Sequence, residues 1–177
     1  MKMSKKNSTS GNVFIYLVIA VVGVFVFVKF IGPQFGINLG KKDANSIEYT
    51  HEEGFPRALN VTEQFEKVRL VIKSEEELKN ALAAVDKNGE IRLPQINWDR
   101  KIALFVTSVT RDAAGYETRI KKITLDQEDL IVEIRDTEPG DTCINTPQLT
   151  LPMDLVVLDK TDMTIEFEVV KVVKECN

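Results

Sequence analysis

The chain has 177 residues, which is enough for one ordinary domain with an appendage and too short for two. Its formal net charge is −4, and because residues 1–31 contain four lysines and no acidic residue, the remaining chain is more acidic than the whole. An acidic body argues against binding nucleic acid through its phosphates, since that needs clustered Lys and Arg. We therefore expect no nucleic-acid partner.

An apolar run from Val13 to Ile31 is long enough to cross a lipid bilayer. Its nineteen residues are apolar apart from Tyr16, Gly23 and Lys29, and as a helix they would span about 28 Å, close to the hydrocarbon thickness of a membrane. The run is longer than the apolar part of a signal peptide, and no small-residue cleavage site follows it. We predict an uncleaved, single-pass signal-anchor in the cell membrane. Basic residues 1–12 would form a cytoplasmic tail, and the C-terminal body would be extracytoplasmic.

Residues 32–54 show no sustained hydrophobic period and contain scattered Gly, Pro, Asn, Lys and Asp. This composition is typical of a flexible linker between a membrane and a domain. Near its end lies His51, the only histidine, followed by Glu52 and Glu53. One histidine without a second makes a weak metal site, so we predict a solvated linker here and a β-rich extracytoplasmic domain over residues 55–177.

A helix is predicted near the beginning of this domain, over residues 74–89. Ser74 and Glu77 have the spacing of a capping box, and three apolar residues then recur on one face of the helix. Gly89 is a natural C-terminal stop. The alternating run Phe65–Ile72 precedes the helix and predicts a strand.

Strand-like runs dominate the chain after the helix. Lys101–Val109 is almost continuously apolar and β-rich, as a central strand would be. Polar turns predict two hairpins, which are Tyr116–Leu125 with Asp129–Thr137, and Met153–Leu158 with Thr164–Val173. The predicted fold is α+β and β-rich: one N-terminal helix and about six or seven mostly antiparallel strands in a small sandwich or open barrel, preceded by the single transmembrane helix.

The sequence contains no established catalytic motif. There is no nucleophile elbow, phosphate-binding loop, dinucleotide fingerprint or zinc-protease helix. We therefore predict no enzymatic activity, no cofactor and no metal. An uncharacterised hydrolase that uses two carboxylates is kept as an alternative, although the sequence selects no particular pair.

The two cysteines have two interpretations. If the domain lies outside the cytoplasm, Cys143 and Cys176 are in a compartment where a disulfide can form, which would fasten a loop to the end of the last strand. The alternative is two separate thiols, one buried and one at the C-terminal tail.

The stretch from Thr137 to Leu158 is rich in Pro and Gly between two strand-like runs, which predicts a long, stiff connection. Together with the central strand, the Ala114-Gly115-Tyr116 turn and the first hairpin, it carries Pro139, Gly140, Cys143 and the sequence Thr150-Leu151-Pro152. In this pattern residues 98–158 resemble the C-terminal domain of the bacterial protease complex subunit PrcB family.

The resemblance implies a non-catalytic accessory subunit that associates with an exported, subtilisin-like protease and stabilises it. A small-ligand or peptide-binding envelope protein is the alternative. The turn and the connection are the expected partner-binding surface, with the candidate residues Gly115, Tyr116, Pro139, Gly140, Ile144, Leu149 and Pro152.

Overall fold

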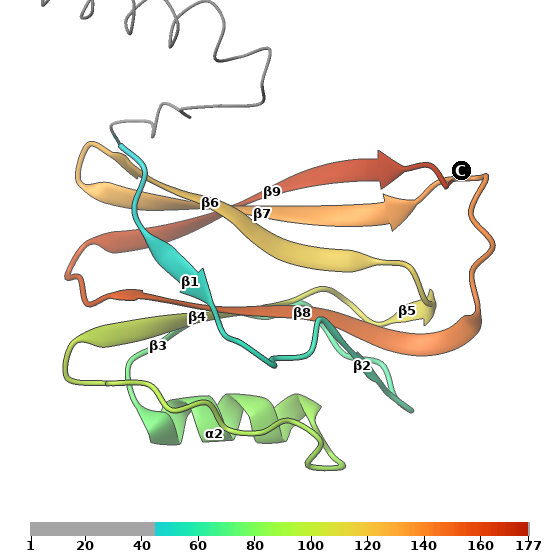
Figure 1. Ribbon diagram of the computed structural model, residues 1–177, viewed down its shortest axis with the longest axis horizontal. Helices are drawn as coiled ribbons and strands as arrows, with labels where there is room; N and C mark the ends of the chain where they lie inside the picture. Colours follow the sequence, from blue (N-terminus) through green and yellow to red (C-terminus); the bar gives the residue numbers. More distant parts are fainter. Residues whose placement is uncertain (1–44, 177) are drawn as a thin grey trace, which may run out of the picture. The chain divides into compact units, whose positions relative to one another are not determined.

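The structure is a computed structural model, and it describes residues 45–176. These residues form three layers: a three-stranded sheet, a six-stranded sheet and a helix (Figure 1). The elements are β1 (Tyr49–His51), β2 (Ala58–Asn60), β3 (Arg69–Ile72), α2 (Glu75–Val85), β4 (Lys101–Thr107), β5 (Arg111–Ala113), β6 (Glu117–Asp126), β7 (Asp129–Pro139), β8 (Pro147–Asp159) and β9 (Thr164–Lys174).

The predicted β-rich α+β class is confirmed, but the strand count was too low. The described residues contain nine strands in two sheets rather than six or seven, and the sheets do not close into a barrel. The three strands that were missed, β1, β2 and β5, are each only three residues long. So short a strand shows no clear alternation of apolar and polar residues, which is the signal that sequence reasoning uses.

The long strand β8 organises the six-stranded sheet. Its C-terminal half pairs with β4 on one side and with β1 on the other, and its N-terminal half pairs in the same way with β5 and β2. All these pairings are antiparallel, and β3 extends the sheet beyond β4. The predicted central strand therefore lies in a central position, between β8 and β3.

Pro152 lies within β8, where proline would normally break a ladder. On one side its carbonyl accepts a hydrogen bond from the Ser108 backbone N–H at 2.9 Å. Ser108 lies opposite Pro152, and the return bond of this pair, from residue 152 to Ser108, is the one that proline cannot make. The missing bond falls between the end of β4 at Thr107 and the start of β5 at Arg111, so the proline lies at a break in the ladder.

The second sheet has the order β6-β7-β9. The predicted hairpin of β6 and β7 is confirmed, with Asp126 opposite Asp129 at the turn. The second predicted hairpin is wrong: β8 and β9 lie in different sheets, and β9 pairs in parallel with β7. The polar connection between them reverses the chain as expected, but it also crosses from one sheet to the other (Figure 1).

Two apolar cores lie on the two faces of the six-stranded sheet. Ala103 and Phe105 of β4 pack toward α2, whereas the alternate residues Ile102 and Leu104 pack toward the three-stranded sheet. β8 divides in the same way between the two cores. Alternate side chains of β4 and β8 point to opposite faces of the sheet, and both faces are buried. This is why the two strands have nearly continuous apolar sequences.

The helix forms as its capping box predicts. The Ser74 side chain accepts a hydrogen bond from the Glu77 N–H, and the Glu77 carboxylate accepts one from the Lys73 N–H. The helix ends at Val85, before the predicted stop at Gly89. Burial alone would raise the pKa of the next carboxyl, Asp86, but backbone N–H groups donate to it and hold that pKa below its usual value.

Part of the predicted flexible linker is ordered sheet. Ile47 donates to the carbonyl of Ile123 in β6, and Tyr49–His51 forms β1 against β8. The domain therefore begins by residue 45 at the latest, not at 55. The predicted transmembrane helix, Val13–Ile31, lies outside the described residues, and no helix within residues 45–176 is long and apolar enough to cross a membrane.

Candidate functional site

The predicted long connection is shorter than its sequence indicated. β7 continues to Pro139 and β8 begins at Pro147, so only residues 140–146 form a loop, which we call the 140–146 loop. The sequence predicts its prolines to be loop residues, but Pro139 ends one strand, Pro147 begins the next, and Pro152 is inside it. All three satisfy the rule that a strand accepts proline at its ends or where no ladder bond is needed.

The structure brings the Gly115 turn and the 140–146 loop together. The Ala114 N–H donates to the Thr146 carbonyl at 3.0 Å. Gly115 has a φ of +99°, and a Cβ built there would lie 2.7 Å from Asn145 Oδ1 and 3.6 Å from Pro139 Cβ. Only glycine satisfies both the backbone conformation and the close approach. These residues form one continuous surface at the end of the sheets where β7 leads into β8.

The two largest candidate side chains of this surface are Tyr116, which is half-buried, and Ile144, which is fully exposed. The Arg111 guanidinium lies 4.7 Å from the Tyr116 ring centroid, in cation–π geometry, and pairs with Glu138 at 3.5 Å. Ile144 projects from the loop with a relative exposure of 103%. This is the highest relative exposure of any large apolar side chain within residues 45–176, and it leaves Ile144 accessible to another molecule.

The C-terminal end of β9 is fastened to the 140–146 loop. Cys143 and Cys176 are joined by a disulfide, with the Cα atoms 4.9 Å apart. Of the two interpretations of the cysteines, the structure therefore has the disulfide rather than two separate thiols. The Thr142 hydroxyl donates to the Glu175 carboxylate at 2.8 Å. Gly140 donates its N–H to the Lys174 carbonyl, and the Glu175 carboxylate occupies the space that a Cβ on Gly140 would need.

Two of the candidate surface residues are not on the surface. Gly140 is buried beneath Glu175, and Pro152 is buried within β8. Leu149 is half-buried, and its carbonyl accepts from the Val61 N–H. Of the seven candidates, Gly115 and Ile144 are therefore exposed, Tyr116 and Pro139 are half-buried like Leu149, and the other two are buried.

Substitution of Gly115 tests how tightly the turn and the loop fit. We expect Gly115→Ala to lower the free energy of unfolding by about 2–3 kcal/mol, because alanine is strained at this φ and meets Asn145. Gly89→Ala is the matched control: Gly89 also has a positive φ, of +68°, but nothing lies within 4 Å of the place that an added methyl group would occupy, so about 1 kcal/mol is expected. Urea denaturation measures both, and equal effects would show that Asn145 does not restrict the turn.

Sequence reasoning missed a polar cluster in the interior. Asp154 of β8 has a relative exposure of 2%, and its carboxylate contacts His51 Nδ1 and Arg119 Nη1, each at 3.1 Å. It also accepts from the Ile120 N–H of β6 at 2.8 Å. A buried carboxylate with a cation, an imidazole and a backbone donor is fully satisfied. The prediction of a solvated His51 in a linker was wrong.

This cluster joins the two sheets. His51 and Asp154 belong to β1 and β8 of the six-stranded sheet. Arg119 and Ile120 belong to β6, an edge strand of the three-stranded sheet. The Tyr49 hydroxyl lies 3.4 Å from the Ile120 carbonyl, and burial, followed by the charge of Asp154, raises the pKa of that hydroxyl. The one signal of this cluster in the sequence was Asp154 itself, an acidic residue in the otherwise apolar run of β8.

No Ser, Thr or Cys side chain within residues 45–176 hydrogen-bonds with His51, so the pair has no adjacent nucleophile to activate. The contacts of the His51–Asp154 pair are those of a structural link between the two sheets. No three His, Cys, Asp or Glu side chains of that range gather as a metal site. The predicted absence of cofactor, metal and catalysis stays a prediction.

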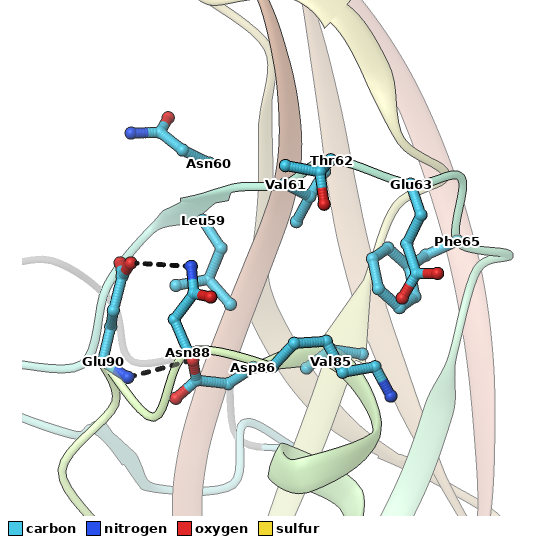
Figure 2. Close-up of a pocket in the computed structure, with 11 residues that line it drawn as sticks. Leu59, Asn60, Val61, Thr62, Glu63, Phe65, Val85, Asp86, Asn88 and Glu90 are labelled. Carbon is cyan, nitrogen blue, oxygen red and sulfur yellow. Dashed lines mark hydrogen bonds between the residues drawn. The ribbon is translucent and has the colours of Figure 1, made fainter.

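A small hollow lies between β2 and the C-terminal end of α2 (Figure 2). Its volume is about 30 Å³, which is the share of one water molecule in the liquid. Asn88 and Glu90 hydrogen-bond at its rim, and the Glu90 N–H donates to Asp86 (Figure 2). This hollow is too small for a substrate.

A wider groove of about 600 Å³ lies between residues 52–60 and residues 90–94. Its walls combine apolar side chains with the carboxylates of Glu52, Glu53 and Glu90 and the guanidinium of Arg92. Sequence reasoning missed this groove, because its two walls are far apart along the chain.

The segment from β4 to β8 carries the similarity to known proteins. Residues 102–159 match the PrcB C-terminal family. The resemblance expected from the sequence is confirmed for this segment. The PrcB C-terminal match includes the Gly115 turn, the 140–146 loop and Asp154, whereas β1, β2, β3, α2 and β9 lie outside it. Comparisons with curated proteins and with solved structures gave no match to the chain.

Proposed function

We propose that this protein is a non-catalytic accessory module that binds an exported protease and stabilises it. The observation that carries the proposal is the PrcB C-terminal match over residues 102–159, because PrcB is the subunit of a bacterial protease complex. The surface formed by Gly115, Tyr116, Pro139 and Ile144 lies within the matched segment and is the proposed contact with the protease.

The structure of the 140–146 loop supports this assignment. The disulfide and the Thr142–Glu175 hydrogen bond hold the loop at one end, and the Ala114 N–H holds it at the other. A loop held in this way loses little conformational entropy when a partner binds. Ile144 can then fill an apolar pocket of the protease while the Arg111–Tyr116 pair contacts its rim.

We propose in addition that the domain is held at the outer face of a bacterial cell membrane. The apolar run Val13–Ile31 would cross the bilayer once, with residues 1–12 in the cytoplasm. The Cys143–Cys176 disulfide supports an extracytoplasmic domain, since such bridges persist in oxidising compartments.

Substitution of Ile144 tests the proposed contact. We expect Ile144→Asp to reduce the recovery of the protease about tenfold or more after cross-linking in native membranes and affinity purification. The reason is that a charge replaces the apolar side chain that the proposed complex would bury. Met163→Asp is the matched control: Met163 is also an exposed apolar residue, but it lies in the connection between β8 and β9, at the other end of β8. Mass spectrometry quantifies the recovered proteins.

A protease recovered equally with both variants would place its contact elsewhere. Recovery of the protein alone, or only with envelope proteins unrelated to proteolysis, would overturn the accessory function. Ile144 is fully exposed, Met163 is 43% exposed, and neither belongs to an apolar core. We therefore expect both variants to fold as the wild type does, and thermal unfolding measures this.

A second candidate function is supported by the wide groove. Its volume of about 600 Å³ and its mixed walls suit an extended peptide or a small ligand with a basic group facing the three glutamates. If the groove is the functional site, Glu90→Lys weakens the binding of basic peptides measured by calorimetry, whereas Ile144→Asp leaves it unchanged.

A further inference from the structure

The outer edge of β9 is a long strand edge that the described residues leave open. β9 has eleven residues and pairs only with β7, on one side. It contains no proline, and Val169, Val170 and Val173 have relative exposures between 41% and 64%. Proteins normally protect such an edge, because its unpaired backbone groups are a template for pairing with another strand.

The opposite edge of the same sheet is covered, which makes the open edge of β9 distinctive. Residues 45–47 lie along β6, where Ile47 donates to Ile123 and Leu125 donates to Asn45. Further along β6, Asp154 accepts from the Ile120 N–H. No strand or bridge within residues 45–176 occupies the corresponding positions beside β9.

The register with β7 shows which backbone groups are available. The Gly140 N–H donates to the Lys174 carbonyl, so Lys174 directs its backbone groups toward β7. Alternate residues of a strand direct theirs to the same side. The odd-numbered residues from Ile165 to Val173 therefore present their N–H and C=O groups to the open side.

The edge is complementary to itself. If a second β9 lies antiparallel to the first about a two-fold axis through Val170, the residue numbers of each facing pair add to 340. Glu166 then faces Lys174 of the partner copy, and this opposite-charge pair occurs twice. Phe167 faces Val173, and Val170 faces its own copy, so no like charges oppose each other.

The neighbouring registers are less favourable. A two-fold axis through Lys171 pairs Glu168 with Lys174, but it also sets two lysines directly opposite each other, which is destabilising. An axis through Val169 places Phe167 opposite Lys171 and leaves Glu166 without an opposite charge. Of the three, only the register centred on Val170 pairs opposite charges without setting like charges against each other.

We propose that β9 pairs with β9 of a second copy of this chain, antiparallel and centred on Val170. The two three-stranded sheets then form one continuous six-stranded sheet across an isologous interface. The disulfide and the hydrogen bonds at Thr142 and Glu175 hold the C-terminal end of the strand in position for this pairing.

Cysteine substitution in the full-length protein tests the register. Val170→Cys should give a disulfide-linked dimer under mild oxidation, because Cα atoms of a non-hydrogen-bonded antiparallel pair lie about 4.5 Å apart, within disulfide range. Glu168→Cys is the matched control on the same face, since its two copies would be separated by four residues, about 13 Å. Peptide mapping distinguishes a bond between the two introduced thiols from exchange with Cys143 or Cys176.

Charge reversal provides an independent measurement. Glu166→Lys or Lys174→Glu alone should weaken dimerisation about tenfold by light scattering, since like charges then face each other twice. The double variant should restore the wild-type dissociation constant. A monomeric wild-type protein, equal cross-linking at positions 168 and 170, or a double variant as weak as the single variants would each overturn the proposal.

Discussion

Replacement of Asp154 by alanine should lower the free energy of unfolding by about 3–5 kcal/mol, which is the usual effect of removing one member of a buried ion pair. The Asp154 carboxylate is 2% exposed and receives His51, Arg119 and the Ile120 N–H. Its removal leaves the Arg119 guanidinium, which is 15% exposed, without its nearest counter-charge. Urea denaturation followed by circular dichroism measures the change.

Two further variants separate charge from shape. Asp154→Asn keeps the size of the side chain and one acceptor oxygen, so a smaller loss of about 1–3 kcal/mol is expected. Asp162→Ala removes an exposed acidic residue from the connection between β8 and β9 and should change stability by less than about 0.5 kcal/mol. If Asp154→Ala were no more destabilising than Asp162→Ala, the cluster would not hold the two sheets together.

Loss of the Cys143–Cys176 disulfide is the second change with a large expected effect. The bridge closes a loop with a sequence separation of 33 residues, and in the chain-entropy model such a loop contributes about 3–4 kcal/mol. Cys143→Ser combined with Cys176→Ser should therefore lower the urea midpoint strongly. Reduction of the wild-type protein is the matched comparison, because it opens the same bond without a substitution.

The location of the effect is as informative as its size. Hydrogen exchange should increase most at the C-terminal half of β9, which the bridge fastens to the 140–146 loop. β6 serves as the internal control, since its outer edge is held instead by residues 45–47 and Asp154. A uniform increase across both strands would mean that the bridge acts on the unfolded chain alone. No increase anywhere would contradict a stabilising bridge.

Local signals identified the elements that form from neighbouring residues. The helix was predicted because Ser74 and Glu77 satisfy its first turn within the helix itself. The β6–β7 hairpin was predicted because a polar turn separates two alternating runs, and Gln127 takes a φ of +54° there. Neither inference required knowledge of the rest of the fold.

The same kind of signal was misleading for β8 and β9. Alternation identifies a strand but not the strand that it pairs with. Ile165 and Phe167 pack into the core shared by the two sheets, and this burial is available beside β7 rather than beside β8. The parallel pairing therefore follows from the layer arrangement, which no window of the sequence contains.

The candidate site was predicted in part for a similar reason. The Gly115 turn and the 140–146 loop do lie together, and Cys143 and Cys176 are joined. Pro152 is buried because β8 begins before it, and His51 is ordered because it reaches Asp154, which is 103 residues away. Contacts at such separation leave no periodic trace in the sequence.

The order of the strands along the chain has a consequence for how the domain matures, because β8 follows all four of the strands that it joins. β1, β2, β4 and β5 all pair with this strand, so they have no complete sheet to join until residues 147–159 have been synthesised. Folding dominated by such distant pairings is slow. A six-stranded sheet that cannot be completed before β8 is available leaves its earlier strands extended, which suits passage through a translocation channel. If the domain is exported as proposed, the bridge can close only after Cys176 itself has crossed the membrane.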